Sequence, residues 1–154
     1  MTIKELDPQI VWKNFYALTQ IPRPSKHEEL AVEYMYNWGV SHGLETIKDE
    51  VGNTIIRKPA TPGCENMKGV ILQGHIDMVL ASEPDKQIDM VTEPITILEE
   101  DGWMTADGTT LGADNGIAVA MMLALLETDK HPRLECLFTV EEETGLAGAK
   151  GFDC

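Results

Sequence analysis

The sequence predicts a layered α/β domain. Two short apolar segments, residues 69–73 and 134–140, have the composition of buried strands. Between them, residues 116–127 are rich in Ala, Leu and Met, which is typical of a buried helix. A strand, a helix and a second strand in this order suit a crossover unit, whose two strands lie parallel in one sheet. We therefore expect an α/β fold of three layers, with helices on both faces of the sheet.

Two helices are predicted before the first strand. In the first, Asp7 is placed to cap a helix that has Pro8 at its first position and ends near Gln20. In the second, Ser25 and Glu28 have the S-x-x-E spacing of a capping box. Helical spacing then predicts the following apolar faces: Ile10, Val11, Phe15 and Leu18 in the first helix, and Leu30, Tyr34 and Trp38 in the second.

Four further segments have the features of exposed or half-buried strands. They are residues 44–49, 54–58, 95–99 and 103–106. The last two flank Asp101-Gly102, a dipeptide that strongly favours a hairpin turn. The segment 69–73 is different because it is wholly apolar, and this predicts a strand that is covered on both faces.

Composition narrows the possible functions. The 154 residues are enough for one domain, and 43% of them are hydrophobic. Twelve basic residues against 26 acidic ones give a formal net charge of −14, which argues against binding to nucleic acid or to an anionic membrane. The longest apolar run, residues 117–126, is too short to cross a bilayer. Three cysteines without CxxC spacing indicate no disulfide framework, so we expect a cytoplasmic protein.

The segment GHID, residues 74–77, places chemistry at the end of a predicted strand. His75 lies at the strand's carboxyl end, where open α/β sheets carry their sites. Asp77 is two residues further on and points the same way, so its carboxylate can reach one ring nitrogen and leave the other free to bind metal. The alternative is structural, because HxD triplets are common: His75 would merely end a strand and Asp77 would begin a turn.

Two more acidic motifs have both a chemical and a structural interpretation. Asp114, in LGADNG, could cap the following helix, or its carboxylate could bridge two metals while Asn115 supplies the cap. Three acids, residues 141–143, follow the apolar strand 134–140. They repel one another unless a positive charge lies among them, although a solvated helix N-terminus would also favour acids.

The joint pattern is more specific than any of its parts. Two strands end in metal-compatible residues, and a third such residue opens the helix between them. Imidazole nitrogen and carboxylate oxygen are the ligands that a catalytic Zn²⁺ pair takes.

Three segments of the chain resemble the N-terminal motifs of a known enzyme family. GHIDMV, ADGTTLGADNG and EEETGLAGA are similar to those of the co-catalytic zinc exopeptidases, which include carboxypeptidase G, aminoacylase and carnosinase. The run GWMTADGTTLGADNGIAVAMMLALLE and the segment IPRPSKHEE most resemble the aminoacyl-histidine dipeptidase branch. The resemblance covers essentially the whole chain but only about the first third of a typical member.

The resemblance implies a role for each motif. His75 would be a terminal ligand of one zinc, Asp114 would bridge both zincs, and Glu143 would be a terminal ligand of the other. Asp77 would orient His75, and Glu142 would act as the general base toward the bridging water. The resemblance also implies a cis peptide after Asp114, gives Glu141 no role, and allows Co²⁺ or Mn²⁺ as substitute metals.

The implied reaction is hydrolysis of the amide bond in Xaa-His dipeptides such as beta-alanyl-histidine. In the family, the remaining metal ligands and a lid or dimerisation domain lie further along the chain. Residues 1–154 are thus expected to be the N-terminal part of a catalytic domain, whose parent could be a homodimer. Each metal would keep only two protein ligands here, so we expect the chain alone to be inactive. Two alternatives stay open: a non-catalytic acidic module that holds metal or binds a partner, and a parent deacylase or tripeptidase.

Overall fold

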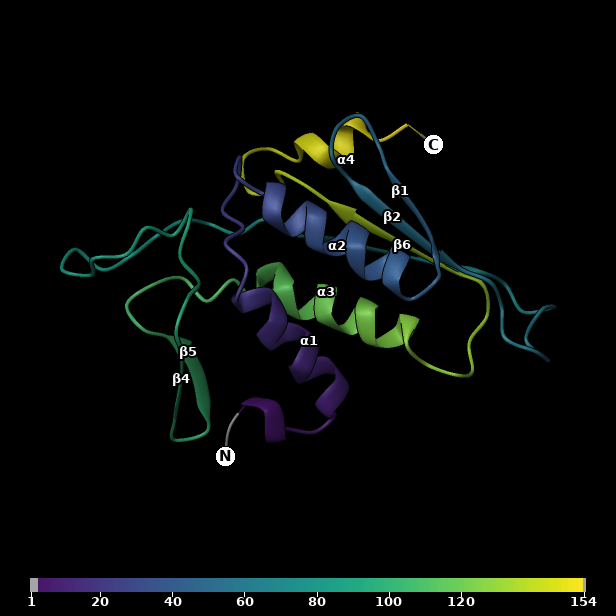
Figure 1. The fold of residues 1–154 in the computed structure, drawn as a ribbon, viewed down its shortest axis with the longest axis horizontal. Helices are drawn as coiled ribbons and strands as arrows, with labels where there is room; N and C mark the ends of the chain where they lie inside the picture. The colour runs from purple at the N-terminus through teal and green to yellow at the C-terminus, as the bar shows by residue number, and fades with distance from the viewer. Residues whose placement is uncertain (1–2, 154) are drawn as a thin grey trace.

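The computed structural model describes residues 3–153 (Figure 1). The helices are η1 (Ile3–Glu5), α1 (Gln9–Thr19), α2 (Glu29–Ser41), α3 (Ala113–Leu126) and α4 (Ala147–Gly151). The main sheet contains β1 (Glu45–Lys48), β2 (Thr54–Lys58), β3 (Val70–His75) and β6 (Leu134–Thr139). A separate hairpin consists of β4 (Ile97–Glu100) and β5 (Trp103–Ala106).

The sheet has the strand order β1-β2-β6-β3. β1, β2 and β6 pair antiparallel, whereas β3 runs parallel to β6, and α3 lies between these two strands in the chain. The α/β class and the predicted pairing of the two apolar strands are therefore confirmed. The register sets His75 opposite Thr139, so β3 and β6 end at the same edge of the sheet. Whatever follows these two strands is brought together there.

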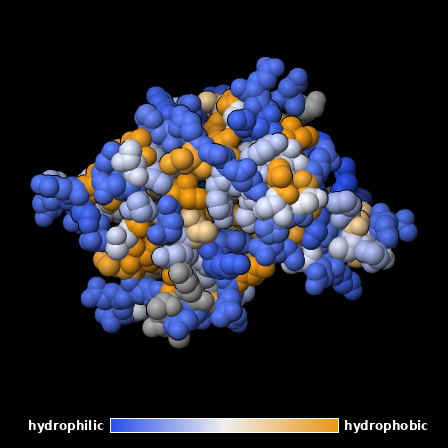
Figure 2. Space-filling model, viewed as in Figure 1, coloured by the Kyte–Doolittle hydropathy of each residue, from blue (hydrophilic) through white to orange (hydrophobic). Residues whose placement is uncertain are grey.

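One continuous core joins the helices to the sheet. Leu134, Cys136 and Phe138 alternate along β6, so they share a face, and all three are buried against the helices. The other large members of the core include Phe15, Leu18, Met35, Ile56, Val119 and Leu123. In the view of Figure 1, α1 and α3 lie below the strands and α4 lies above them. The face shown in Figure 2 is mainly hydrophilic, with small scattered hydrophobic areas.

Both predicted helix caps are wrong. Pro8, not Asp7, is the cap residue of α1, and Glu28 is the cap residue of α2. Ser25 donates its hydroxyl hydrogen bond to the Asp77 carboxylate rather than to the helix, and the Glu28 carboxylate accepts one from the Glu141 N–H. In the folded chain, both side chains lie next to polar groups from distant parts of the sequence, and these groups also need hydrogen-bond partners.

Two predictions about burial also need correction. The apolar strand β3 is not covered on both faces in the part of the chain described: it lies at the sheet edge, and Ile71 is 67% exposed. In α2 the buried stripe contains Ala31, Met35 and Trp38, while Leu30 is exposed. Leu30 directly precedes Ala31, so its side chain is rotated by about 100° around the helix axis, away from that stripe.

Cys64 and Cys136 are buried and free, and Cys154 lies outside the described residues. Within residues 3–153 no helix is both long and apolar enough to span a membrane.

Candidate metal centre

His75 is the last residue of β3, and its two ring nitrogens have different surroundings. Nδ1 lies 3.2 Å from the backbone oxygen and 3.3 Å from Oδ1 of Asp77. Nε2 faces two other acids, at 3.2 Å from Asp114 Oδ1 and 3.8 Å from Glu142 Oε2. Asp77 therefore holds the inner side of the ring, and the outer nitrogen points to where a cation would be shared with carboxylates.

Asp77 is fully buried, and hydrogen bonds surround its carboxylate. Oδ2 accepts from the Ser25 hydroxyl at 2.7 Å and from the Glu143 N–H at 3.2 Å, while Oδ1 accepts from the Glu142 N–H at 3.0 Å. Burial alone raises the pKa of Asp77, but these bonds and the contact with His75 outweigh it and lower the pKa to about 2. Asp77 therefore stays negatively charged and also fixes the backbone of the residues after β6.

The acids around His75 change its proton affinity. Burial alone lowers the pKa of His75, but hydrogen bonding to Asp77 and the negative charge of that residue act against it. With smaller contributions from Asp114 and Glu142, they raise the pKa of His75 to about 9. The same negative surroundings favour a divalent cation at Nε2 in place of the proton.

Asp114 approaches from the start of α3. Its backbone and that of Asn115 are not helical, and the peptide bond between them is cis, as the resemblance implies. Gly112, with φ of +67°, precedes the first residue of α3, and the non-helical backbone of Asp114 and Asn115 kinks the helix just after its start. The side chain of Asp114 is 87% exposed and reaches across to His75.

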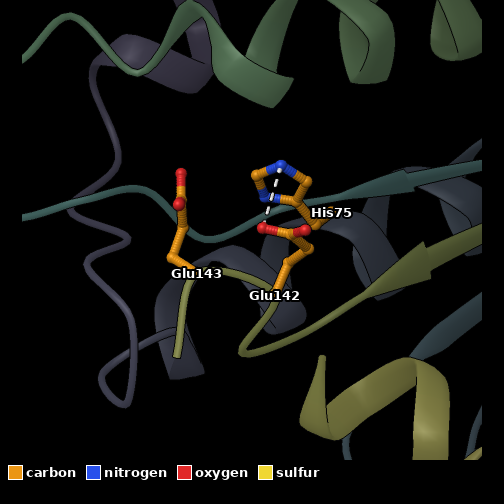
Figure 3. Close-up of side chains that lie close together, drawn as sticks. All are labelled: His75, Glu142 and Glu143. Carbon is orange, nitrogen blue, oxygen red and sulfur yellow. Dashed lines mark ion pairs between the residues drawn. The ribbon is translucent and has the colours of Figure 1, made fainter. Parts of the chain in front are cut away.

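Glu142 and Glu143 complete the cluster from the turn that follows β6 (Figure 3). One ligand atom from each of His75, Glu142 and Glu143 lies within 4.8 Å of the others. Burial raises the pKa of Glu143; the charge of His75 lowers it, and the smaller effects of the other acids raise it again. Imidazole nitrogen and carboxylate oxygen at such spacing fit a divalent transition metal. The acids do not begin a helix, since α4 starts only at Ala147.

The structure therefore places the proposed site residues around His75, with Asp77, Asp114 and Glu142 in direct contact with its ring. The three-residue group that could hold a metal differs from the expected ligand set, because it contains Glu142 in place of Asp114 beside His75 and Glu143. Glu141, which had no proposed role, has φ of +49°, and its carboxylate accepts a hydrogen bond from the Thr144 hydroxyl. Glu141 instead lines a groove of about 1030 Å³ that runs beside the site, along α2 and the turn after β1. None of the cluster residues lines that groove.

Sequence analysis missed a buried arginine behind the cluster. Arg23 is 1% exposed and donates from Nη1 to the Ile76 carbonyl at 2.8 Å and from Nη2 to the Gly112 carbonyl at 2.5 Å. Burial lowers its pKa to about 10, partly offset by the charge of Asp77, so Arg23 remains a cation at neutral pH. The one local signal is an arginine in an otherwise apolar and proline-rich break between two helices.

The sequence profile of peptidase family M20/M25/M40 matches residues 71–152. The chain is 45% identical over 151 residues to the cytosol non-specific dipeptidase of Escherichia coli, covering 97% of this chain and 31% of that protein. The aminoacylhistidine dipeptidase structure from Vibrio alginolyticus superimposes with a TM-score of 0.97 at 45% identity, covering 100% of this chain and 32% of that one.

A more distant solved structure is aminopeptidase PepT of Bacillus cereus. It has a TM-score of 0.75 and 28% identity, covering 94% of this chain and 39% of that one. The chain thus spans about a third of the length of the two dipeptidases it matches. The expected resemblance to the dipeptidase branch is confirmed. A profile match over more than half of the residues, at the strands and motifs that form the site, places the chain in peptidase family M20/M25/M40.

Proposed function

We propose that this chain is the N-terminal part of the catalytic domain of a metal-dependent dipeptidase, which cleaves the amide bond of Xaa-His dipeptides such as beta-alanyl-histidine. The observation that carries the proposal is the convergence of His75, Glu142 and Glu143 within 4.8 Å. It occurs in a chain that is 45% identical to dipeptidases and spans about a third of their length. The name of the Escherichia coli relative favours the cytosol as the location.

Each residue of the cluster has a place in this proposal. His75 and Asp114 would hold one Zn²⁺, and Asp114 and Glu143 would hold the other, with Co²⁺ or Mn²⁺ as chemically similar substitutes. When bound, such a pair polarises a carbonyl and lowers the pKa of a water molecule. The remaining ligands would come from other parts of a longer protein, which could also supply a lid or dimerisation domain.

The chain's own residues supply the proton chemistry and the orientation. Glu142 is the acid of the turn that lies 3.8 Å from His75 Nε2, and we assign it to accept the proton of the attacking water. Asp77 keeps the His75 ring oriented, because its carboxylate is itself held by the Ser25 hydroxyl and two backbone N–H groups.

The test begins with the complete reading frame that encodes this sequence. Its product, loaded with Zn²⁺, should hydrolyse beta-alanyl-histidine, and a chelator should abolish the activity. Glu142→Gln should lower kcat by about a hundredfold to ten-thousandfold, as expected for loss of a general base. The matched control is Glu141→Gln, the neighbouring acid outside the cluster, which should leave kcat nearly unchanged. Equal losses in the two variants would contradict the assignment.

The 154-residue chain alone should bind Zn²⁺ more weakly and show no measurable turnover, because each metal would keep only two protein ligands. Turnover comparable to that of the longer product would refute this ligand argument. A reading frame that ends at Cys154 would instead favour the non-catalytic module.

One observation supports a second substrate class. A tripeptidase structure from Staphylococcus aureus matches with a TM-score of 0.75 and 26% identity over 94% of this chain. Faster cleavage of tripeptides than of Xaa-His dipeptides would favour that alternative.

A further inference from the structure

The segment between α1 and α2 contacts every loop of the candidate metal centre. Arg23 reaches the backbone of two loops, and Ser25 reaches Asp77 in one of them. Glu28, at the end of the segment, holds the third loop by accepting the Glu141 N–H. None of these three residues belongs to the metal cluster, and all three precede residue 71, where the family match begins.

Within this segment, Arg23 links the backbone next to His75 to the backbone next to Asp114. The Ile76 carbonyl directly follows His75, and the Gly112 carbonyl lies two residues before Asp114. Nη1 holds the first carbonyl and Nη2 the second, and both belong to one rigid planar group. The guanidinium therefore fixes the distance between the backbone that carries His75 and the backbone that carries Asp114.

The glycines around Asp114 fit this arrangement closely. A Cβ atom at Gly112 would lie 2.6 Å from Arg23 Nη2, and one at Gly116 would lie 2.7 Å from the same atom. At such separations a side chain would have to displace Nη2, the atom that donates to the Gly112 carbonyl. The two glycines of LGADNG therefore leave the space in which the arginine meets the backbone on both sides of Asp114.

Charge neutralisation alone does not explain these contacts. Arg57 is a partly exposed arginine that pairs directly with the carboxylates of Glu45 and Glu135. Arg23 instead donates to backbone carbonyls although Asp77 is nearby, and its Nε has no partner in the described part of the chain. Burying a guanidinium with one unsatisfied N–H is costly, so its placement is better explained by what the other two arms hold.

We propose that Arg23 is a positioning residue that sets the separation of His75 and Asp114, and thereby the geometry in which Asp114 can bridge two metals. The proposal deepens the metal-centre function above and rests on it for its catalytic consequence. It assigns Arg23 no contact with metal or substrate. Lysine should not replace Arg23, because a single ammonium group lacks the planar fork that reaches both carbonyls in fixed directions.

The first experiment measures geometry without metal. Crystals of the complete reading-frame product and of its Arg23→Met and Arg23→Lys variants are grown in chelator. The separation of His75 Nε2 and Asp114 Oδ1, 3.2 Å in the present structure, should exceed hydrogen-bond distance in both variants. Arg57→Met is the matched control and should leave the separation unchanged. If Arg23→Met does not fold, Arg23→Lys and Gly116→Ala still test the proposal, because both disturb the placement of the Arg23 guanidinium beside Gly112. An unchanged separation in the folded Arg23 variants would overturn the proposal.

The second experiment measures function in the same proteins. Zn²⁺ titration by calorimetry should show that the Arg23 variants lose about tenfold to a hundredfold in affinity for the second metal, a loss typical of residues that orient metal ligands. Turnover should fall through kcat with KM nearly unchanged. A merely structural arginine would lower the midpoint of urea unfolding and leave the ratio of first to second affinity as it is. That result would overturn the positioning role.

The two experiments separate this inference from the proposed function. If the unaltered protein binds no Zn²⁺ and cleaves no dipeptide, the proposed function fails, while the chelated crystals still show whether Arg23 sets the His75–Asp114 separation. If the protein is an active enzyme and the variants match it in geometry and metal affinity, the inference alone fails.

Discussion

The inner half of the candidate metal centre, His75 and Asp77, is held very differently from its outer half, Asp114, Glu142 and Glu143. The side chains of the inner half are 7% and 0% exposed, and Asp77 is hydrogen-bonded at both oxygens. In the outer half, the side chains of Asp114 and Glu142 are 87% and 34% exposed. The fold fixes the inner half by packing and hydrogen bonds, whereas it fixes only the backbone of the outer half. The inner half should therefore govern stability, and the outer half should govern metal binding.

The largest expected effect on stability comes from breaking the inner half. Asp77→Ala removes a buried charge and leaves the Ser25 hydroxyl and two backbone N–H groups without their acceptor. We expect the free energy of unfolding to fall by about 3 to 5 kcal/mol, measured by urea denaturation of the 154-residue chain. Asp114→Ala is the control and should change the free energy by less than about 0.5 kcal/mol, because its side chain is exposed. Similar losses in the two variants would erase the distinction between the halves.

For metal affinity we expect the opposite ranking: substitutions in the outer half should have the larger effect. Asp114→Ala removes a proposed bridging ligand, and the hydrogen bond that it loses, with His75 Nε2, is only partly buried. Zn²⁺ affinity should drop by more than about a hundredfold, because losing only a residue that orients a metal ligand already costs up to about that amount. Calorimetric titration measures the loss, and Asp107→Ala, on a surface ion pair with Lys86, is the control. Undiminished Zn²⁺ binding by Asp114→Ala would remove this residue from the metal site.

Ser25 tests a smaller part of the inner half. Ser25→Ala deletes the 2.7 Å hydrogen bond to Asp77 Oδ2, which still accepts the Glu143 N–H. A bond to a charged acceptor contributes about 1.5 to 3 kcal/mol to stability, and we expect a loss of about 1.5 kcal/mol in urea unfolding. Ser41→Ala, whose hydroxyl donates to a carbonyl on the helix surface, should cost less. If Ser41→Ala costs more than Ser25→Ala, the Asp77 contact is not important for stability.

The smallest expected effect depends on pH. Burial raises the pKa of Glu28, and Asp77 adds to this, although backbone N–H groups act against both. A carboxyl with a raised pKa binds its proton more tightly in the folded chain, so its contribution to stability falls as pH rises through the unfolded and then the folded pKa. Glu28→Gln keeps an oxygen for the Glu141 N–H and removes the charge. The variant should be more stable than the original chain at pH 8, by about 0.5 kcal/mol, and should lose this advantage at pH 4.

Urea unfolding at both values of pH tests this prediction, with Glu29→Gln, an exposed acid of the same helix, as the control. An advantage of Glu28→Gln that is equal at pH 4 and pH 8 would show that ionisation of Glu28 does not affect stability.

Local pattern was sufficient for the main elements and for the positions of the candidate site residues at their ends. The helix α3, the strand β6 and the β4–β5 hairpin follow from apolar periodicity and from the Asp101-Gly102 turn, which depend only on near neighbours. His75, Asp114 and the acids 141–143 could be proposed because each lies at the end of such an element, and the resemblance to the family gave Glu142 and Glu143 their separate roles. Once β3 and β6 are parallel neighbours, those ends must meet at one edge.

Only the tertiary structure decided what surrounds that cluster. Ser25 lies 52 residues from Asp77, Arg23 lies 89 residues from Gly112, and Glu28 lies 113 residues from Glu141. The sequence by itself favoured Ser25 and Glu28 as a local capping box and left Arg23 without a role. A polar side chain takes the partner that burial leaves unsatisfied, and burial depends on which distant segments the fold brings together. For the same reason the exposure of Ile71 in an apolar strand could not be predicted: residue type sets which strands can be buried, but the position in the sheet sets which ones are.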